Sequence, residues 1–111
     1  MKDDRERVLH ILDAIERIER YTIRGQDTYG DDELIQNWMI WHLQVIGEAA
    51  RSLSEPFRER HPEIPWAKII GMRHILVHEY FGIDLAIVWQ SVSTDVPNLK
   101  RFLEQALQGL P

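Results

Sequence analysis

The sequence predicts an all-α fold, an up-and-down bundle of four or five helices in one domain that spans residues 1–111. Apolar residues recur at intervals of three and four along nearly the whole chain, and no segment alternates as a strand would. With 111 residues, of which 44% are hydrophobic, the chain can bury one core but leaves no room for a second domain of ordinary size.

The first predicted helix runs from Asp3 to about Tyr21, and its acidic start suits an N-cap and first turn. Its apolar positions fall on one face: Val8, Ile11, Leu12, Ile15 and Ile18. The next segment, residues 24–30, holds two glycines and several polar turn formers, so it is predicted to be a loop.

A long helix is predicted from about Asp32 to Leu53, with an unusually wide apolar surface. Leu34 and Trp41, seven residues apart, extend that surface sideways, so the helix needs neighbours on two sides, one of which a second copy of the chain could supply. His42 falls on the main apolar stripe and is expected to be a buried, hydrogen-bonded histidine. Gly47, unfavourable inside a helix, indicates close packing against a neighbouring helix.

Shorter helices complete the predicted bundle. Ser54 and Pro56 favour a short helix over residues 55–60, and the prolines of HPEIP make a connector after it. A further helix is predicted from Pro65 to Tyr80, and Gly82 interrupts the helical pattern just beyond it. Asp84 caps the last helix, in which Pro97 is expected to produce a kink or a division.

Composition excludes several classes of protein. The absence of cysteine removes disulfides, thiolate metal sites and thiol nucleophiles, and is compatible with the cytoplasm, where we place the chain. No apolar run approaches the length of a membrane span, and the N-terminus does not resemble a signal peptide. The net charge of −5 argues against a protein that coats nucleic acid through a broad basic surface, but leaves room for a local basic site.

The segment GMRHILVHEY carries the side chains best suited to chemistry: Arg73, His74, His78 and Tyr80. Histidine exchanges protons near neutral pH, and the arginine fork matches phosphate oxygens. Together they suit metal-independent cleavage of a phosphodiester: histidine moves protons to or from the 2′-hydroxyl and the leaving oxygen, and arginine stabilises the charge on phosphorus.

Helical geometry limits how this segment could act. On one straight helix, Arg73 and His78 would point about 140° apart and could not meet at one phosphate. Either the helix ends or distorts near His78, or a second copy of the chain completes the site across a two-fold axis. We favour the dimer, in which one His78 acts as base while its mate acts as acid.

Structural explanations stand beside the catalytic one. His78 could be a surface histidine, Tyr80 an ordinary packed tyrosine, and Arg73 the ion-pair partner of Glu48 or Glu79. A metal site on His74 and His78 has little support without cysteines or an HExxH motif. The four tryptophans are expected in the core or at an interface: Trp38, Trp41, Trp66 and Trp89.

The Arg-x4-His-x-Tyr pattern of Arg73, His78 and Tyr80 resembles the HepT-like toxins of the HEPN superfamily, small helical proteins. His74 departs from the polar residue, often Asn, that commonly follows the Arg. The resemblance extends to Val45–Ala50, to Ile64–Trp66 and to the DLAIVW start of the last helix, so it spans most of the chain in the family's order.

The resemblance implies a metal-independent ribonuclease without a cofactor, acting on RNA as a homodimer with its active site in the dimer cleft. Arg73 and His78 would be catalytic, and His74 and Glu48 would support them. It also implies a cognate partner, a minimal nucleotidyltransferase antitoxin that transfers AMP from ATP onto Tyr80. The alternatives are a non-catalytic helical partner of a nucleotidyltransferase and a structural dimerisation module.

Overall fold

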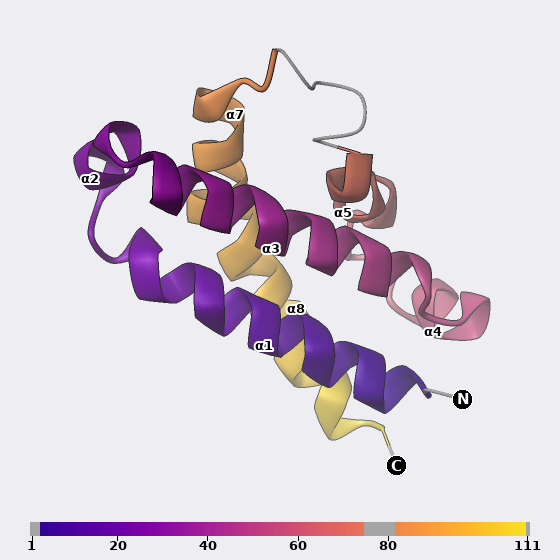
Figure 1. Ribbon diagram of the computed structural model, residues 1–111. Coiled ribbons are helices and arrows are strands. Elements are labelled where there is room, and N and C mark those ends of the chain that lie inside the picture. The colour runs from indigo at the N-terminus through magenta and orange to yellow at the C-terminus, as the bar shows by residue number, and fades with distance from the viewer. Residues whose placement is uncertain (1–2, 75–81, 111) are drawn as a thin grey trace.

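A computed structural model describes residues 3–74 and 82–110, and within these ranges the chain is helical with no strand. Two long helices, α1 (Asp4–Thr22) and α3 (Glu33–Arg51), lie side by side and antiparallel. The C-terminal helices, α7 (Leu85–Gln90) and α8 (Val96–Gln108), cross behind this pair (Figure 1). The predicted all-α fold is therefore confirmed.

The first helix begins as predicted, because the Asp3 carboxylate accepts a hydrogen bond from the Glu6 amide at 2.9 Å. The predicted loop over residues 24–30 is wrong, since Gly25, at φ 93°, makes the turn and α2 (Gln26–Asp31) follows. Tyr29 on α2 is 3% exposed, and its hydroxyl donates to the Leu85 carbonyl oxygen at 2.7 Å. This hydrogen bond and the contact of the Tyr29 ring with Trp89 fix α2 to α7, although α2 is too short to show an apolar period.

The third helix carries the centre of the core. Asp32 caps it by accepting hydrogen bonds from the amides of Leu34 and Ile35. The helix packs mainly against α1, α5 and η1. The predicted burial of His42 is confirmed at 6% exposure. The fully buried side chains that fill the space around it include Ile11, Ile15, Ile18, Met39, Leu43, Ile46, Leu99 and Leu103.

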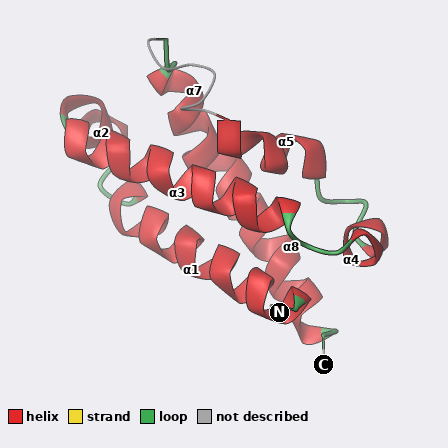
Figure 2. Cartoon of the chain, turned by 45° about the vertical axis from the view of Figure 1, so that its right-hand side comes forward, coloured by secondary structure: helices red, strands yellow, loops and turns green. Residues whose placement is uncertain are grey.

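Short elements close one end of the bundle, as Figure 2 shows. The predicted short helix is confirmed as α4 (Glu55–Arg60), capped by the Ser54 hydroxyl. Ser54 is itself fixed to the start of α1, because its amide and hydroxyl donate to the two carboxylate oxygens of Asp4 at 2.9 and 2.7 Å. The Trp66 indole nitrogen donates to the Arg58 and His61 carbonyl oxygens, which holds the connector against α5.

The predicted continuous helix from Pro65 to Tyr80 is wrong in its middle. The α-helical part, α5 (Trp66–Gly71), ends at Gly71, and a single 3₁₀ turn, η1 (Met72–His74), follows. Glycine is a weak helix former, which favours the end of α5 at Gly71. The tighter 3₁₀ turn then brings the backbone of η1 into contact with α3. The rest of the predicted helix lies outside the described residues.

Pro97 changes the last helix in the way its chemistry requires. Proline has no amide to donate to the carbonyl four residues back. The segment before it, η2 (Ser91–Asp95), is a π-helical turn in which the Val96 amide donates to the Ser91 carbonyl oxygen. The prediction that Pro97 kinks or divides this helix is confirmed as a π-turn between α7 and α8.

Candidate active site

Arg73 lies where the backbone of η1 touches α3. A Cβ atom placed on Gly47 would come within 2.5 Å of the Arg73 amide nitrogen and 3.0 Å of the Ile70 carbonyl oxygen. Both contacts are to backbone atoms, which cannot swing aside, so a side chain at position 47 would force η1 away from α3. The prediction that Gly47 serves close packing is confirmed. The element that packs against Gly47 is η1, the turn that carries Arg73.

The guanidinium of Arg73 keeps part of its binding capacity. Its Nη1 atom lies 3.6 Å from Oε2 of Glu48, with 32% of the arginine side chain and 58% of the glutamate side chain exposed. The Nε atom is buried and has no hydrogen-bond partner within the described residues. The Glu48 carboxylate therefore orients this cation from one side at ion-pair distance, and the exposed part of the arginine side chain can meet an oxyanion.

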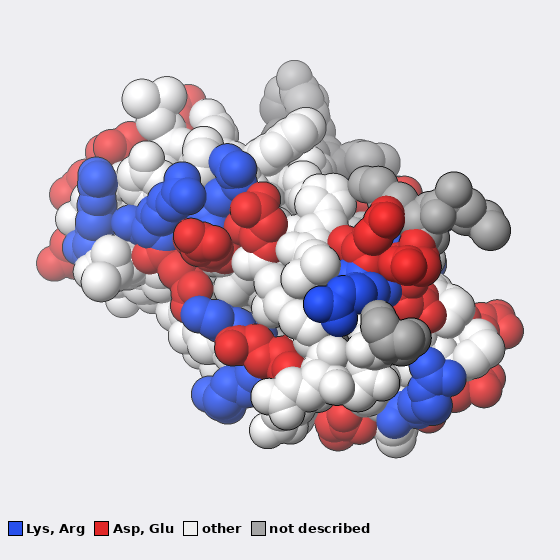
Figure 3. Space-filling model, turned by 90° about the horizontal axis from the view of Figure 1, so that it is seen from below, with Lys and Arg blue, Asp and Glu red and all other residues white. Residues whose placement is uncertain are grey.

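Positive charge gathers locally around Glu48. Arg51 Nη1 lies 3.9 Å from Glu48 Oε1, so two arginines share this one carboxylate. Lys68, the other cation that the sequence places near the motif, lies 3.1 Å from Asp95 and is engaged there. On the face seen in Figure 3, by contrast, basic and acidic side chains alternate and form no broad basic surface.

The remaining motif residues divide into described and undescribed ones. His74 lies on the same 3₁₀ turn as Arg73 and is half-buried. His78, Glu79 and Tyr80 lie outside the described residues. The predicted 140° separation of Arg73 and His78 assumed a straight α-helix, and this assumption fails because α5 ends at Gly71. Both ways of bringing Arg73 and His78 together, a distorted segment and a second copy, therefore stay open.

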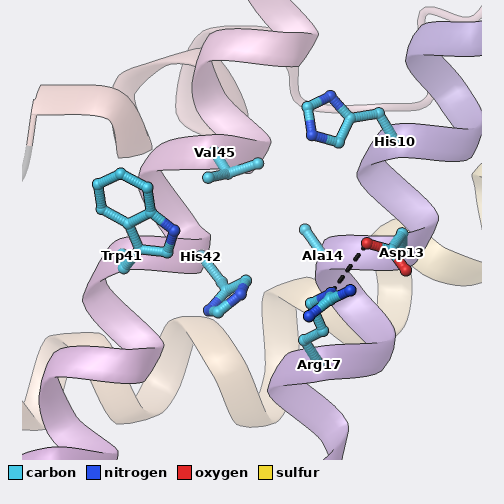
Figure 4. A pocket seen from close by; sticks show the side chains of 7 residues that line it. All are labelled: His10, Asp13, Ala14, Arg17, Trp41, His42 and Val45. Carbon is cyan, nitrogen blue, oxygen red and sulfur yellow. Dashed lines mark hydrogen bonds and ion pairs between the residues drawn. The ribbon is translucent and has the colours of Figure 1, made fainter.

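A groove along the seam of α1 and α3 leads to this cluster. Its larger hollow, about 410 Å³, is lined by side chains of both helices that Figure 4 labels: His10, Asp13, Ala14, Arg17, Trp41, His42 and Val45. A second hollow, about 250 Å³, shares two of these and extends past Glu48; it is lined by Arg7, His10, Val45, Glu48, Ala49 and Ser52. Because the hollows share wall residues, we treat them as one feature, the α1–α3 groove.

The sequence reasoning did not find this groove. Trp41 is 61% exposed, so it does not belong to the core. The other tryptophans are partly buried and pack against the core: Trp38, Trp66 and Trp89. A signal existed, because Leu34, Trp41 and Glu48 are each seven residues apart and form one line on the exposed side of α3. Leu34 and Trp41 are the apolar members of this line, and its third member, Glu48, is the ion-pair partner of Arg73.

The described part of the chain holds neither a candidate metal site nor a helix that could span a membrane. No group of three or more His, Asp and Glu side chains there could hold a metal ion. No helix there has the length and apolar character needed to cross a lipid bilayer.

Comparison with known proteins places the chain in a family. Residues 11–106 match the family model described as "Ribonuclease HepT-like". The chain is 36% identical over 109 residues to a protein of Caldanaerobacter subterraneus subsp. tengcongensis named "Putative RNase", covering 97% of both chains. It is 40% identical over 97 residues to the "Probable ribonuclease HepT" of Thermococcus cleftensis, covering 86% of this chain and 87% of that one.

A third relative is longer. The chain is 37% identical over 110 residues to the "Gamma-glutamylcyclotransferase and putative RNase" of Methanocaldococcus jannaschii, covering 98% of this chain but about half of that one, 50%. No solved structure matches the chain. The family model covers most of the helical bundle, including α3, α5 and the Arg73 turn. The chain therefore belongs to the HepT-like ribonuclease family.

Proposed function

We propose that this chain is a metal-independent endoribonuclease that acts as a homodimer and serves as the toxin of a toxin–antitoxin pair in the cytoplasm. The observation that carries the proposal is the environment of Arg73, whose guanidinium is oriented by Glu48 at 3.6 Å while 32% of the side chain stays exposed. Such a cation suits an oxyanion that forms transiently on phosphorus. The family match to ribonucleases supports RNA as the substrate.

In the proposed mechanism, Arg73 and His78 divide the work of one displacement. One His78 takes the proton of the 2′-hydroxyl as the 2′-oxygen attacks phosphorus, and the P–O bond to the 5′-oxygen breaks. The second copy of His78 in the dimer returns a proton to the leaving 5′-oxygen. Arg73 binds the non-bridging oxygens, on which negative charge increases in the transition state, and His74 and Glu48 support it.

The proposed control of this activity acts on Tyr80. A minimal nucleotidyltransferase antitoxin would attach AMP to Tyr80, seven residues beyond Arg73: the Tyr80 oxygen bonds to the α-phosphorus of ATP, its proton is lost and pyrophosphate leaves. The added phosphodiester carries negative charge and the adenosine is bulky, so the modification would both repel RNA and occupy space beside the arginine.

The experiment is RNA degradation by the purified protein in the presence of EDTA. Wild type is expected to cleave RNA, His78→Ala and Arg73→Ala are expected to lose cleavage, and both variants should keep the fold and oligomeric state. Arg20→Ala is the matched control, because Arg20 is an exposed arginine on α1 whose ion pair with Glu16 is long, at 3.9 Å. Cleavage that EDTA abolishes, or that survives in His78→Ala, would contradict the mechanism.

The toxin assignment needs a separate experiment. Expression of the wild type in a bacterial host should stop growth, and expression of Arg73→Ala should not. Labelled AMP should be incorporated by wild type but not by Tyr80→Phe when a co-encoded nucleotidyltransferase is supplied. If RNA stays intact in every condition while Tyr80 still accepts AMP, the chain is instead a non-catalytic partner of the transferase.

A further inference from the structure

We propose that the α1–α3 groove binds single-stranded RNA, with one base stacked on Trp41 and the adjoining strand directed along α3 toward Arg73. The inference rests on the proposed ribonuclease function and adds the place where substrate outside the scissile phosphate is held. Four observations carry it: the continuity of the groove, the exposure of Trp41, the chemistry of His42 and the flanking arginines.

The groove gives a continuous path to the arginine. His10 and Val45 line both of its hollows, and Glu48, which lines the second hollow, is the ion-pair partner of Arg73. Trp41 and Glu48 are seven residues apart on α3, so they lie about 10 Å from one another along the helix axis and on the same side of it. A strand lying in the groove would therefore pass from the indole to Glu48, the carboxylate that contacts the guanidinium of Arg73.

Trp41 is a large apolar ring that the fold does not use. The side chain is 61% exposed at the wall of the larger hollow. Its neighbour Trp38, by contrast, donates from its indole nitrogen to the Arg17 carbonyl oxygen at 2.8 Å and contacts the Tyr21 ring edge-on. An exposed indole beside a groove offers the flat surface on which any nucleobase can stack.

His42 supplies a fixed hydrogen-bond acceptor in the same hollow. Its Nδ1 atom lies 2.7 Å from the Trp38 carbonyl oxygen, which can only accept, so neutral His42 carries its proton on Nδ1. The ring also packs at 4.4 Å against the Trp38 ring, which holds its orientation. Nε2 is then the acceptor on a ring that lines the hollow, suited to an N–H group on a base edge.

Arginines flank both hollows. Arg17 lines the larger one and Arg7 the smaller one. Arg17 also binds Asp13 at 2.9 Å, as the dashed line in Figure 4 marks, but both side chains are about half exposed. Water screens such a pair, so an RNA phosphate can share or replace the carboxylate. Asp13 and Glu48 balance the two arginines in the lining, so the indole, the imidazole acceptor and exchangeable arginine contacts, rather than net charge, favour a strand with aromatic bases over an apolar protein surface.

The experiment measures binding of an eight-nucleotide single-stranded RNA with 2′-O-methyl groups, which cannot be cleaved because no 2′-hydroxyl is present. Fluorescence anisotropy is compared for wild type, Trp41→Ala, Trp41→Phe and Leu34→Ala. Trp41→Ala should weaken binding by about tenfold, the size that loss of one stacked base produces, and Trp41→Phe should recover most of it. Leu34→Ala should bind as wild type, because Leu34 is an apolar residue of α3, 80% exposed, that lines neither hollow.

A photocrosslink locates the strand directly. With 4-thiouridine in the oligonucleotide, crosslinked peptides should come from residues 7–17 and 41–52 of the groove walls. Unchanged affinity in Trp41→Ala, or crosslinks confined to other segments, would overturn the proposal. A shift of Trp41→Ala from dimer to monomer in sedimentation, with crosslinks absent from the groove, would also overturn it and assign the surface to a second copy of the chain.

Failure of this inference can be told apart from failure of the proposed function. If wild type does not cleave RNA but Trp41-dependent binding is found, the ribonuclease proposal fails and the groove remains. If cleavage depends on Arg73 and His78 while Trp41→Ala binds RNA normally, the groove proposal alone is wrong.

Discussion

The two sides of α3 make contacts of opposite kinds. On one side, α1 and α3 are held apart by large side chains, among them Ile11, Ile15 and Leu43, which are fully buried. On the other side, η1 touches α3 through backbone atoms over Gly47, where there is no side chain at all. The first contact buries apolar surface and stabilises the fold, whereas the second also fixes the position of one arginine.

The largest expected effect lies on the first side. Leu43→Ala removes a fully buried side chain from the centre of the bundle, and such substitutions cost about 2–5 kcal/mol of unfolding free energy. Urea unfolding measures that loss. If the α1–α3 contact stabilises the fold without positioning Arg73, the fraction that remains folded should cleave RNA at the wild-type rate. Loss of cleavage in the folded fraction would show that the core also positions the site.

The contact of α2 with α7, near the start of α3, depends on the buried Tyr29 hydroxyl. Burial, and then the charge of Asp84, raise the pKa of Tyr29 to about 12. A raised pKa means that the folded state favours the neutral phenol, so this stability is complete below pH 10 and is lost as the pH rises toward 12. A rise of the pKa from 10 to about 12 corresponds to about 2–3 kcal/mol of stability that depends on pH.

The measurement is urea unfolding at several pH values from 9 to 12, for wild type and for Tyr29→Phe. Wild type should lose stability more steeply than the variant over the upper part of this range. Tyr29→Phe should also start about 1 kcal/mol lower, because the hydrogen bond to the Leu85 carbonyl oxygen is gone. Parallel curves for the two proteins would contradict the assignment to Tyr29.

The second side of α3 is tested by Gly47→Ala. In an open helix this change gains up to about 1 kcal/mol, but here the new methyl group meets the Arg73 amide at 2.5 Å. We expect a net loss of about 1–3 kcal/mol from the forced shift, and a loss of RNA cleavage much larger than the loss of folded protein. Gly30→Ala is the matched control, since it lies within α2 and a Cβ there meets nothing within 4 Å. Equal behaviour of the two variants would show that the close contact does not position Arg73.

The elements that the sequence predicted correctly are those whose structure depends on local rules. The apolar period specifies α1 and α3, and the side chains of Asp3, Ser54 and Asp84 cap helices where they were expected to. Pro97 disturbs the last helix because it lacks an amide, which no tertiary contact can replace. These features need no knowledge of the partner helix.

The elements that the sequence missed depend on tertiary contacts. α2 exists because Tyr29 reaches a buried position under α7, a contact between residues 56 positions apart. α5 stops at Gly71 because the following turn packs onto α3, and an apolar pattern that continues through the motif conceals this. Local propensity cannot report either contact.

The candidate site shows the same division. The residue types of Arg73 and Glu48 indicated an ion pair, and the structure places them together. Their positions relative to the α1–α3 groove could not be predicted, because that groove requires the register of two helices that are distant in sequence. His10, which lines both hollows, shows no pattern of its own in the sequence.

The smallest effect on stability, and the most informative one about the site, is expected for Glu48→Gln. Glu48 is 58% exposed and its nitrogen contacts are at 3.6 and 3.9 Å, so its ion pairs contribute less than about 1 kcal/mol to folding. Its proposed role is to orient Arg73, while its negative charge opposes RNA in the groove.

The two roles of Glu48 predict opposite changes in Glu48→Gln: tighter binding of uncleavable RNA, because a like charge is removed, and slower cleavage at saturating RNA, because Arg73 is no longer oriented. Glu48→Asp, which keeps the charge but shortens the reach, should bind RNA as wild type and still cleave slowly. If Glu48→Gln binds more tightly and also cleaves at the wild-type rate, the packing over Gly47 alone positions Arg73.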